Sequence, residues 1–159
     1  MLILFEGKKH MKYIMVILTL ILTLKAFSEE TTLNRNEIVG KINVKVCNVK
    51  NDKGQVVVEL YTKKKKFPTP EGVIRREKNS ISQGMSEVTF EDVPFGTYAI
   101  TINHDTNMND RMDKNSFGLP SEGYGFSNNP RLIIGPPSFK KASFIVNQDS
   151  ISLMIKMKY

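Results

Sequence analysis

The chain has 159 residues, of which 40% are hydrophobic, and it carries 23 Lys and Arg against 16 Asp and Glu. This length suits one domain with one core. Cys47 is the only cysteine, which excludes an intramolecular disulfide, and we expect it to be a partly buried strand residue.

An apolar segment lies near the start of the chain. Residues 13–24 read YIMVILTLILTL, which is shorter than the about 20 apolar residues that a membrane-spanning helix needs. Three lysines precede it, as in a signal peptide. The small residues Ala26 and Ser28 predict cleavage after Ser28, and Met11 is an alternative start to Met1. An uncleaved membrane anchor is the other interpretation, and the lysine that follows the segment argues against it.

Cleavage of residues 1–28 predicts an exported protein, periplasmic or extracellular at the outer envelope, with no stable membrane span. Residues 29–159 carry 19 Lys and Arg against 15 Asp and Glu. This modest excess does not suggest nucleic acid, so we expect an envelope or extracellular ligand. The lysine run 63–66 predicts a solvated loop; weak contact with anionic envelope lipid or polysaccharide is the alternative.

Residues 29–37 are polar and predict a flexible N-terminal arm. From Ile38 to Val46 apolar and polar residues alternate, which predicts a half-buried strand. A turn signal at residues 51–54 precedes a second strand at Val56–Tyr61, and we expect these two strands to form a hairpin. Residues 63–83 predict a long polar connection that could hold a short edge segment.

Four more segments alternate in the same way: Glu87–Val93, Tyr98–His104, residues 142–146 and residues 151–159. No segment after the leader shows a sustained helical period. Six such strands predict an all-β fold for residues 38–159, an antiparallel Greek-key β-sandwich of immunoglobulin-like type.

One connection, from Asp105 to Phe139, is 35 residues long. Loops beyond about 15 residues are uncommon in compact domains and are often functional. Its Asn, Asp and Gly residues predict an ordered loop rich in turns. Its apolar residues are enough to fold back onto the sandwich: Phe117, Leu119, Tyr124, Phe126, Leu132, Ile133 and Ile134.

The first part of this loop, HDTNMNDRMDKN, has oxygen-bearing residues at the spacing of a calcium loop. The candidate ligands are Asp105, Asn107, Asn109, the backbone carbonyl of Arg111, and Asp113, with Glu122 reaching in from further along the loop. Asp110 and Ser116 stand where calcium loops carry Gly and Glu, so we expect weak calcium binding. The alternative is a polar turn whose Asp and Asn side chains cap their own backbone.

His104 continues the inward face of its strand, whereas Asp105 points to the other face. We expect His104 to end the core and to bond loop backbone. A hydrolase using His104 and Glu122 is a further hypothesis, although the sequence has no nucleophile motif. Tyr98 predicts a structural corner, and Tyr124 and Phe126 are expected either to pin the loop or to offer platforms for sugar or peptide.

The run VPFGTYAITINHDTNMNDRMDKNSFGLPSEGYGFSNN, followed by GPPSFKKASFIV, resembles the bacterial family known as domain of unknown function 2141. The resemblance covers residues 39–159. It implies an exported envelope protein with a sandwich similar to transthyretin-like and carboxypeptidase-regulatory domains. The family pattern, HD-x-N-x-N-G-x-x-D, carries Gly where this chain has Asp110.

Together these observations predict an exported, non-catalytic β-sandwich binding module of unknown ligand, whose loop is organised by calcium. Two alternatives remain open at this point. One is a metal-free structural or interaction protein of the cell envelope, and the other is the hydrolase that uses His104.

Overall fold

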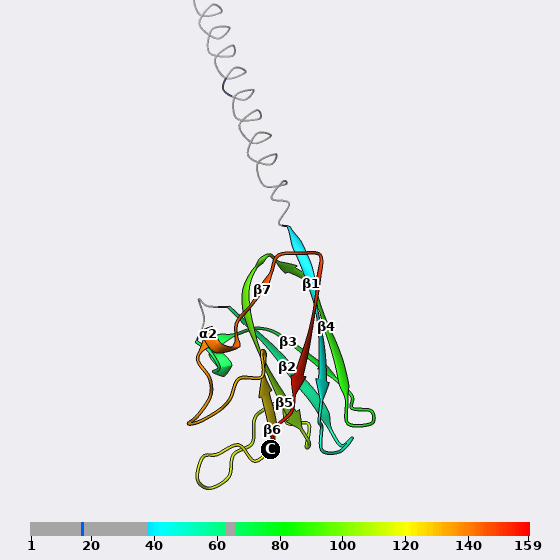
Figure 1. Ribbon diagram of the computed structural model, residues 1–159, viewed down its shortest axis with the longest axis vertical. Helices are drawn as coiled ribbons and strands as arrows, with labels where there is room; N and C mark the ends of the chain where they lie inside the picture. Colours follow the sequence, from blue (N-terminus) through cyan, green and yellow to red (C-terminus); the bar gives the residue numbers. More distant parts are fainter. Residues whose placement is uncertain (1–16, 18–37, 63–65) are drawn as a thin grey trace, which may run out of the picture. The chain divides into compact units, whose positions relative to one another are not determined.

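The computed structural model describes residue 17 and residues 38–62 and 66–159 (Figure 1). The expected signal peptide, apart from Ile17, the N-terminal arm 29–37 and residues 63–65 lie outside the described residues. Within the described residues, no helix is long and apolar enough to cross a membrane. Residues 38–159 form one compact unit.

This unit consists almost entirely of β-strands. The strands are β1 (Val39–Cys47), β2 (Gln55–Thr62), β3 (Val73–Asn79), β4 (Ser86–Pro94), β5 (Gly96–Asp105), β6 (Gly123–Phe126), β7 (Phe144–Val146) and β8 (Ser150–Lys156). A 3-10 turn, η1 (Pro70–Gly72), precedes β3, and a four-residue helix, α2 (Phe139–Ala142), precedes β7.

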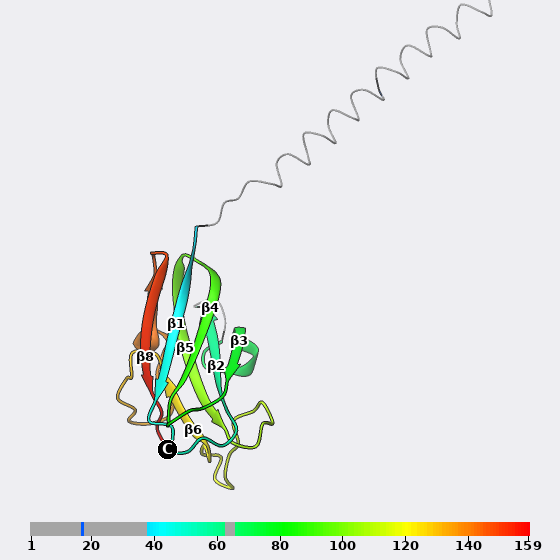
Figure 2. The same cartoon turned by 90° about the vertical axis from the view of Figure 1, so that its right-hand side faces the viewer.

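The strands form two sheets. One has the order β4-β1-β8, which Figure 2 shows with β1 in the middle. The other has the order β3-β2-β5-β6, and β7 pairs with the opposite end of β5. The expected all-β, sandwich-like fold is therefore confirmed.

The core lies between the sheets and follows the alternation of β1 and β4. In β1, Ile42, Val44 and Val46 are buried, and in β4, Val88 and Phe90 are buried. Burial of these side chains removes apolar surface from water, which is the main stabilising contribution to such a fold. The alternation in the sequence therefore predicted the buried faces of β1 and β4 correctly.

The expected hairpin between the first two strands is wrong. β1 pairs with β4 and β8, whereas β2 lies in the other sheet between β3 and β5. The pairing of β1 with β8 is parallel, so the fold is mostly but not purely antiparallel. Period-two alternation determines which face of a strand is buried, but it does not determine the partner strand.

Two other local predictions need correction, and a third is confirmed. The long connection after β5 contains a strand, β6, which pairs with residues 101–104 of β5. Ala142 belongs to the short helix α2 and not to a strand, although it is buried. The polar connection 63–83 does contain an edge strand, β3, which pairs with β2.

A second apolar cluster covers part of the outer face of the five-stranded sheet. Its buried members are Ala99, Phe126 and Ala142, with Phe67, Tyr124, Leu132 and Phe139 packed against them. Tyr124, Phe126 and Leu132 thus fold back as expected. Four other apolar residues of the long connection do not, because they occupy exposed turns: Phe117, Leu119, Ile133 and Ile134.

Candidate functional site

The candidate site is the 106–122 loop, which leaves the end of β5 and returns as β6 (Figure 1). It starts beside β2, because Gln55 of β2 lies opposite Asp105 of β5. Asp105 is fully buried although it points to the outer face of the sheet. The loop therefore begins on a fixed strand end, and its first carboxylate is held within the structure.

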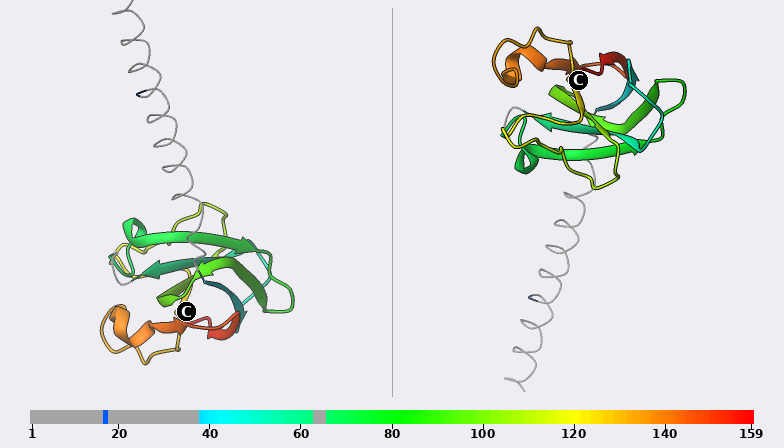
Figure 3. Two further views of the ribbon diagram at one scale, coloured as in Figure 1. Left: turned by 90° about the horizontal axis from the view of Figure 1, so that it is seen from above. Right: turned by 90° about the horizontal axis from the view of Figure 1, so that it is seen from below.

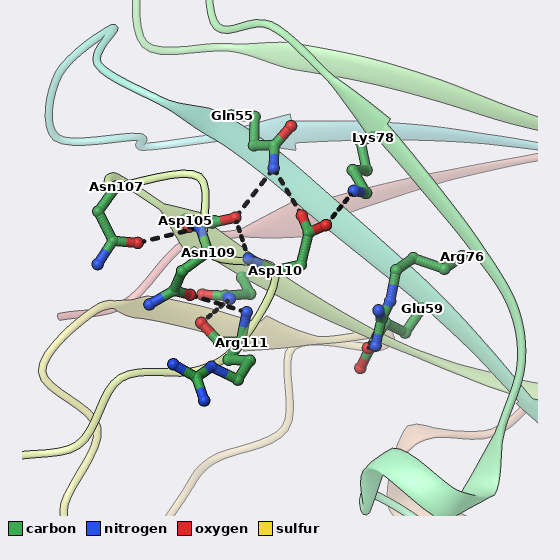
Figure 4. A network of polar contacts seen from close by, with 10 residues as sticks. Gln55, Glu59, Arg76, Lys78, Asp105, Asn107, Asn109, Asp110 and Arg111 are labelled. Carbon is green, nitrogen blue, oxygen red and sulfur yellow. Dashed lines mark hydrogen bonds and ion pairs between the residues drawn. The ribbon is translucent and has the colours of Figure 1, made fainter.

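The Asp105 carboxylate organises the first turn of the loop (Figure 4). Its Oδ1 accepts the backbone N–H of Asn109 at 3.0 Å, and its Oδ2 accepts the backbone N–H of Asp110 at 2.9 Å. The side-chain amide of Gln55 donates to the same Oδ2 at 2.9 Å. Three N–H donors therefore replace water around this buried carboxylate.

Asp110 adopts a left-handed backbone with φ of 63°. Aspartate tolerates this conformation better than most residues. Its carboxylate leaves the loop interior and bonds Gln55 at 3.0 Å and Lys78 of β3 at 2.6 Å (Figure 4). The hydrogen bond from Lys78 holds the pKa of the Asp110 carboxyl below its usual range. Asp110 therefore ties the loop to the edge strand.

The next three candidate ligands bond one another. The side-chain amides of Asn107 and Asn109 donate to the two oxygens of Asp113 at 2.8 and 2.9 Å. The Asn107 Oδ1 accepts the N–H of Asn109, and the Asn109 Oδ1 accepts the N–H of Arg111. The Arg111 carbonyl accepts a longer bond, 3.4 Å, from Asn103 of β5. These are the backbone caps that the sequence offered as the alternative to calcium.

Glu122 joins the start and the middle of the loop. It is 7% exposed, and its Oε1 accepts the N–H of Thr106 at 3.0 Å while its Oε2 accepts the N–H of Asp113 at 3.1 Å. The sequence predicted that Glu122 would reach back to this loop, and it does. All six candidate ligands therefore belong to one hydrogen-bonded network.

As arranged, this network does not fit a calcium ion. Calcium needs about six to eight oxygens directed at one point, but the amide nitrogens of Asn107 and Asn109 face Asp113. The oxygens of both amides face backbone N–H groups instead. In the described part of the chain, no group of three or more His, Cys, Asp or Glu residues is placed to hold a metal.

His104 lies at the end of the core and is fully buried. Its Nε2 lies 2.8 Å from the Lys53 carbonyl, which can only accept, so Nε2 carries the hydrogen. Its Nδ1 is then free to accept the hydroxyl of Tyr159 at 2.7 Å, and that hydroxyl also accepts the N–H of Lys50. His104 thus bonds loop backbone, as the sequence predicted.

A structural corner at residues 127–129 went unrecognised in the sequence. The Ser127 hydroxyl donates to the Ala142 carbonyl at 2.6 Å and accepts the N–H of Ile100 at 2.9 Å. Asn128 donates to the Ser143 carbonyl at 2.7 Å. Asn129 bonds the backbone of β8. The available signal was two adjacent asparagines, both of which have left-handed φ angles.

Tyr98 also has the structural role predicted for it, since its hydroxyl donates to the Pro94 carbonyl at 2.8 Å. Two open hollows, of about 270 and 290 Å³, lie on the described surface. The first lies across β1, β4 and β8, and the second is lined by residues 79–87. Neither hollow is lined by His104 or by the 106–122 loop.

Comparison with known proteins gives one match. The family described as "Uncharacterized protein conserved in bacteria (DUF2141)" matches residues 44–153, which run from within β1 to within β8 and include the whole loop. No curated protein and no solved structure matches the chain.

Proposed function

We propose that this chain, which belongs to the bacterial family DUF2141, is an exported binding module without catalytic activity. In this proposal the 106–122 loop is the recognition element. One observation carries it: the buried carboxylates of Asp105 and Glu122 hold the loop backbone from inside, which leaves Phe117 and Leu119 exposed on its surface. A loop ordered before binding loses less conformational entropy when a ligand arrives.

The geometry around His104 supports a non-catalytic function. A general base needs a nitrogen within reach of a substrate proton. Both ring nitrogens of His104 already have partners, Tyr159 and the Lys53 carbonyl. Glu122 is equally occupied with backbone N–H groups. The hydrolase hypothesis would require both residues to lose these bonds.

Export is proposed from the leader sequence and tested by fractionation. The full chain is produced in a Gram-negative host, and the mass of the protein is measured in each fraction. We expect a protein that begins at Glu29 in the periplasm or the medium. A full-length protein retained in the cytoplasm or the inner membrane would contradict export.

The preformed loop is tested by amide hydrogen exchange. We expect the N–H groups of Thr106, Asn109, Asp110 and Asp113 to be protected, because each donates to a carboxylate of Asp105 or Glu122. A Glu122→Gln variant should lose protection at either Thr106 or Asp113, because its side-chain amide accepts at one atom only, and should keep protection at Asn109 and Asp110. Exchange of all four amides at the rate of an unstructured peptide would refute a preformed loop.

Organisation of the loop by calcium is the second candidate, and one observation favours it. Every hydrogen bond to Asp105, Asp113 and Glu122 comes from a neutral N–H or O–H group, so these carboxylates keep their negative charge within a small volume. Calcium would require both asparagine amides to rotate and present their oxygens. A hydrogen-bonded loop needs no such change.

Thermal unfolding in calcium and in chelator distinguishes a loop organised by calcium from a loop held by hydrogen bonds alone. We expect equal melting temperatures, because the loop already has its hydrogen bonds. A site with Kd of about 1 mM would add about 1.4 kcal/mol at about 10 mM calcium, which raises the melting temperature by several degrees. Such a rise, abolished by Asp113→Asn, would establish calcium as the organiser of the loop.

A further inference from the structure

We propose that the partner of this module is an anionic lipid bilayer, bound through the tips of two loops. The first is the 106–122 loop, so this inference rests on the function proposed above. The second is the 128–138 loop, which connects β6 to α2. Each loop exposes large apolar side chains beside basic ones.

These apolar side chains are mostly exposed. Phe117 and Leu119 of the first loop are 89% and 60% exposed, and Ile133 and Ile134 of the second are 80% and 94% exposed. Single exposed apolar residues are ordinary on protein surfaces. Two large apolar residues together at each of two loop tips are not, and such exposure marks interaction surfaces.

Local structure holds these side chains outward. In the first loop, the Asn115 Oδ1 accepts the backbone N–H of both Phe117 and Leu119, and Asn115 and Leu119 also pair through their backbones. In the second loop, Leu132 packs into the second apolar cluster. The exposed tips are therefore fixed parts of the fold.

The charges beside the second tip are positive. Arg131, Lys140 and Lys141 are exposed on the second loop and on α2, and residues 123–148 contain no acidic residue. The first loop exposes Arg111 and Lys114. The same loop carries Asp110, which pairs with Lys78, and Asp113, which accepts two neutral amides, so the basic charge of this surface comes mainly from the second loop. The positive charge of the second loop and α2 is complementary to anionic headgroups.

The two loops project on the same side of the unit. In Figure 1 the yellow 106–122 loop and the gold 128–138 loop both extend to the left, away from β1 and β4. The view from above in Figure 3 shows the same projection. A flat surface on this side can therefore meet both tips. Separate apolar tips suit a fluid interface, which has no fixed shape to match, better than the surface of a folded protein.

Vesicle co-sedimentation tests the proposal. The parent chain and its variants, all with the same N-terminus, are mixed with vesicles of phosphatidylcholine alone or of phosphatidylcholine with phosphatidylglycerol. We expect the parent chain to bind the anionic vesicles at least tenfold more tightly than the neutral ones. Added salt should weaken this binding.

The variants separate the two contributions to binding. Phe117→Ser and the double change Ile133→Ser with Ile134→Ser should each weaken binding about tenfold, because they remove apolar burial in the interface. Lys140→Gln with Lys141→Gln should weaken it about 25-fold, about fivefold for each charge. Ile145→Ser is the matched control, since Ile145 is 61% exposed on β7 and outside both loops. It should bind like the parent chain.

Three outcomes would overturn the bilayer as partner: no binding to anionic vesicles, equal binding to both vesicle types, or loop variants that bind like the parent chain. Thermal melts of each variant check that the fold is kept, as expected for exposed positions. If the loop amides are protected from exchange but the chain does not bind vesicles, the bilayer is rejected as partner and the proposal of a preformed recognition loop stands. Unprotected amides would remove the proposed function itself.

Discussion

At the scale of single residues, the acidic side chains of the loop act as internal caps. Asp105 and Glu122 are buried, and their oxygens accept backbone N–H groups that the loop could not satisfy otherwise. An unsatisfied buried N–H is costly, so each carboxylate stabilises one conformation of the loop against many. The polar composition of the loop is thus mainly a property of its own folding.

Glu122→Gln should lower the free energy of unfolding by about 1–3 kcal/mol, because an amide can accept at one atom only and one loop N–H loses its partner. Denaturant unfolding measures the change. Glu87→Gln is the control: Glu87 forms an exposed ion pair with Lys45, at 3.1 Å, and its loss should cost less than about 1 kcal/mol. Equal effects of the two substitutions would contradict the capping role.

Tyr61 makes the free energy of unfolding depend on pH in the alkaline range. Burial, and then the neighbouring carboxylate of Glu59, raise the pKa of the Tyr61 phenol above its ordinary value of 10.0. Its hydroxyl donates to Glu59 at 2.8 Å, a bond that only the neutral phenol can make. The stabilisation is therefore complete below pH 10 and is lost as pH rises above it.

Denaturant unfolding measured from pH 8 to pH 11 tests this dependence on pH. The parent chain should lose stability at the alkaline end, and Tyr61→Phe should remove the part of that loss that belongs to this phenol. The phenylalanine ring keeps the edge contact with Phe67, whose centroid lies 5.1 Å away. A pH profile unchanged by the substitution would refute the role of Tyr61.

At the scale of elements, the corner after β6 joins the two sheets. Asn129 donates to the Met154 carbonyl at 2.9 Å and accepts the N–H of Lys156 at 2.8 Å, so one side chain occupies backbone positions on the edge of β8. The backbones of Tyr124 and Lys158 also pair across the sheets. A covered edge of this kind is less open to pairing with another chain.

Asn129→Ala should cost about 2–4 kcal/mol, because it removes both bonds to β8 and places alanine at a left-handed φ of 46°. Asn129→Gly removes the same two bonds to β8, but glycine adopts the left-handed backbone without strain. It should therefore lower the free energy of unfolding by less than Asn129→Ala, and its effect measures the contribution of the two bonds. Thermal or denaturant unfolding distinguishes the variants. If glycine restored full stability, the side-chain bonds to β8 would contribute nothing.

The strand faces could be predicted from the sequence, but the pairing of the strands could not. Ile42, Val44 and Val46 show their buried face by alternation, whatever strand lies beside them. The parallel partner of β1 is more than a hundred residues away, and nothing local encodes that choice. β6 was missed because two of its four residues are glycines, whose value here is close approach to Tyr159 and to Ile102.

The candidate site could be predicted to a similar extent. The spacing of Asp105, Asn107 and Asn109 located a loop whose side chains converge, and Glu122 was placed with them. The bonds from Gln55 and Lys78 could not be foreseen, because they depend on the registers of β2 and β3 beside the loop. The exposed tips were also missed, because the sequence of an irregular loop does not indicate whether an apolar side chain points toward the core or toward solvent.

At the scale of the whole molecule, Tyr159 links three segments at one end of the sandwich. Its hydroxyl meets His104 at the end of β5 and the N–H of Lys50, and its ring fills the space above Gly123 of β6. A single side chain thus connects β5 and β6 with the turn that follows β1. The loop begins directly beside this closure, at Asp105.

Tyr159→Phe should lower the free energy of unfolding by about 1–3 kcal/mol, because the His104 ring and the Lys50 N–H each lose a partner while the aromatic packing remains. Denaturant unfolding gives the value, and the nitrogen chemical shifts of His104 report the lost bond directly. Tyr159→Leu adds the loss of ring packing and should cost more. If the nitrogen chemical shifts of His104 stay unchanged in Tyr159→Phe, the hydrogen bond between Tyr159 and His104 would be contradicted.

The parallel pairing of β1 with β8 has a consequence for how the chain folds during synthesis. Residues 39–47 are made before the other strands but cannot complete their sheet until residues 150–156 have been made. Until then β1 can pair only with β4, and one of its edges stays open to other chains. Contacts this distant in sequence also slow folding, because long loops must close before the contacts form. The three-stranded sheet is therefore completed late, after most of the chain has left the ribosome.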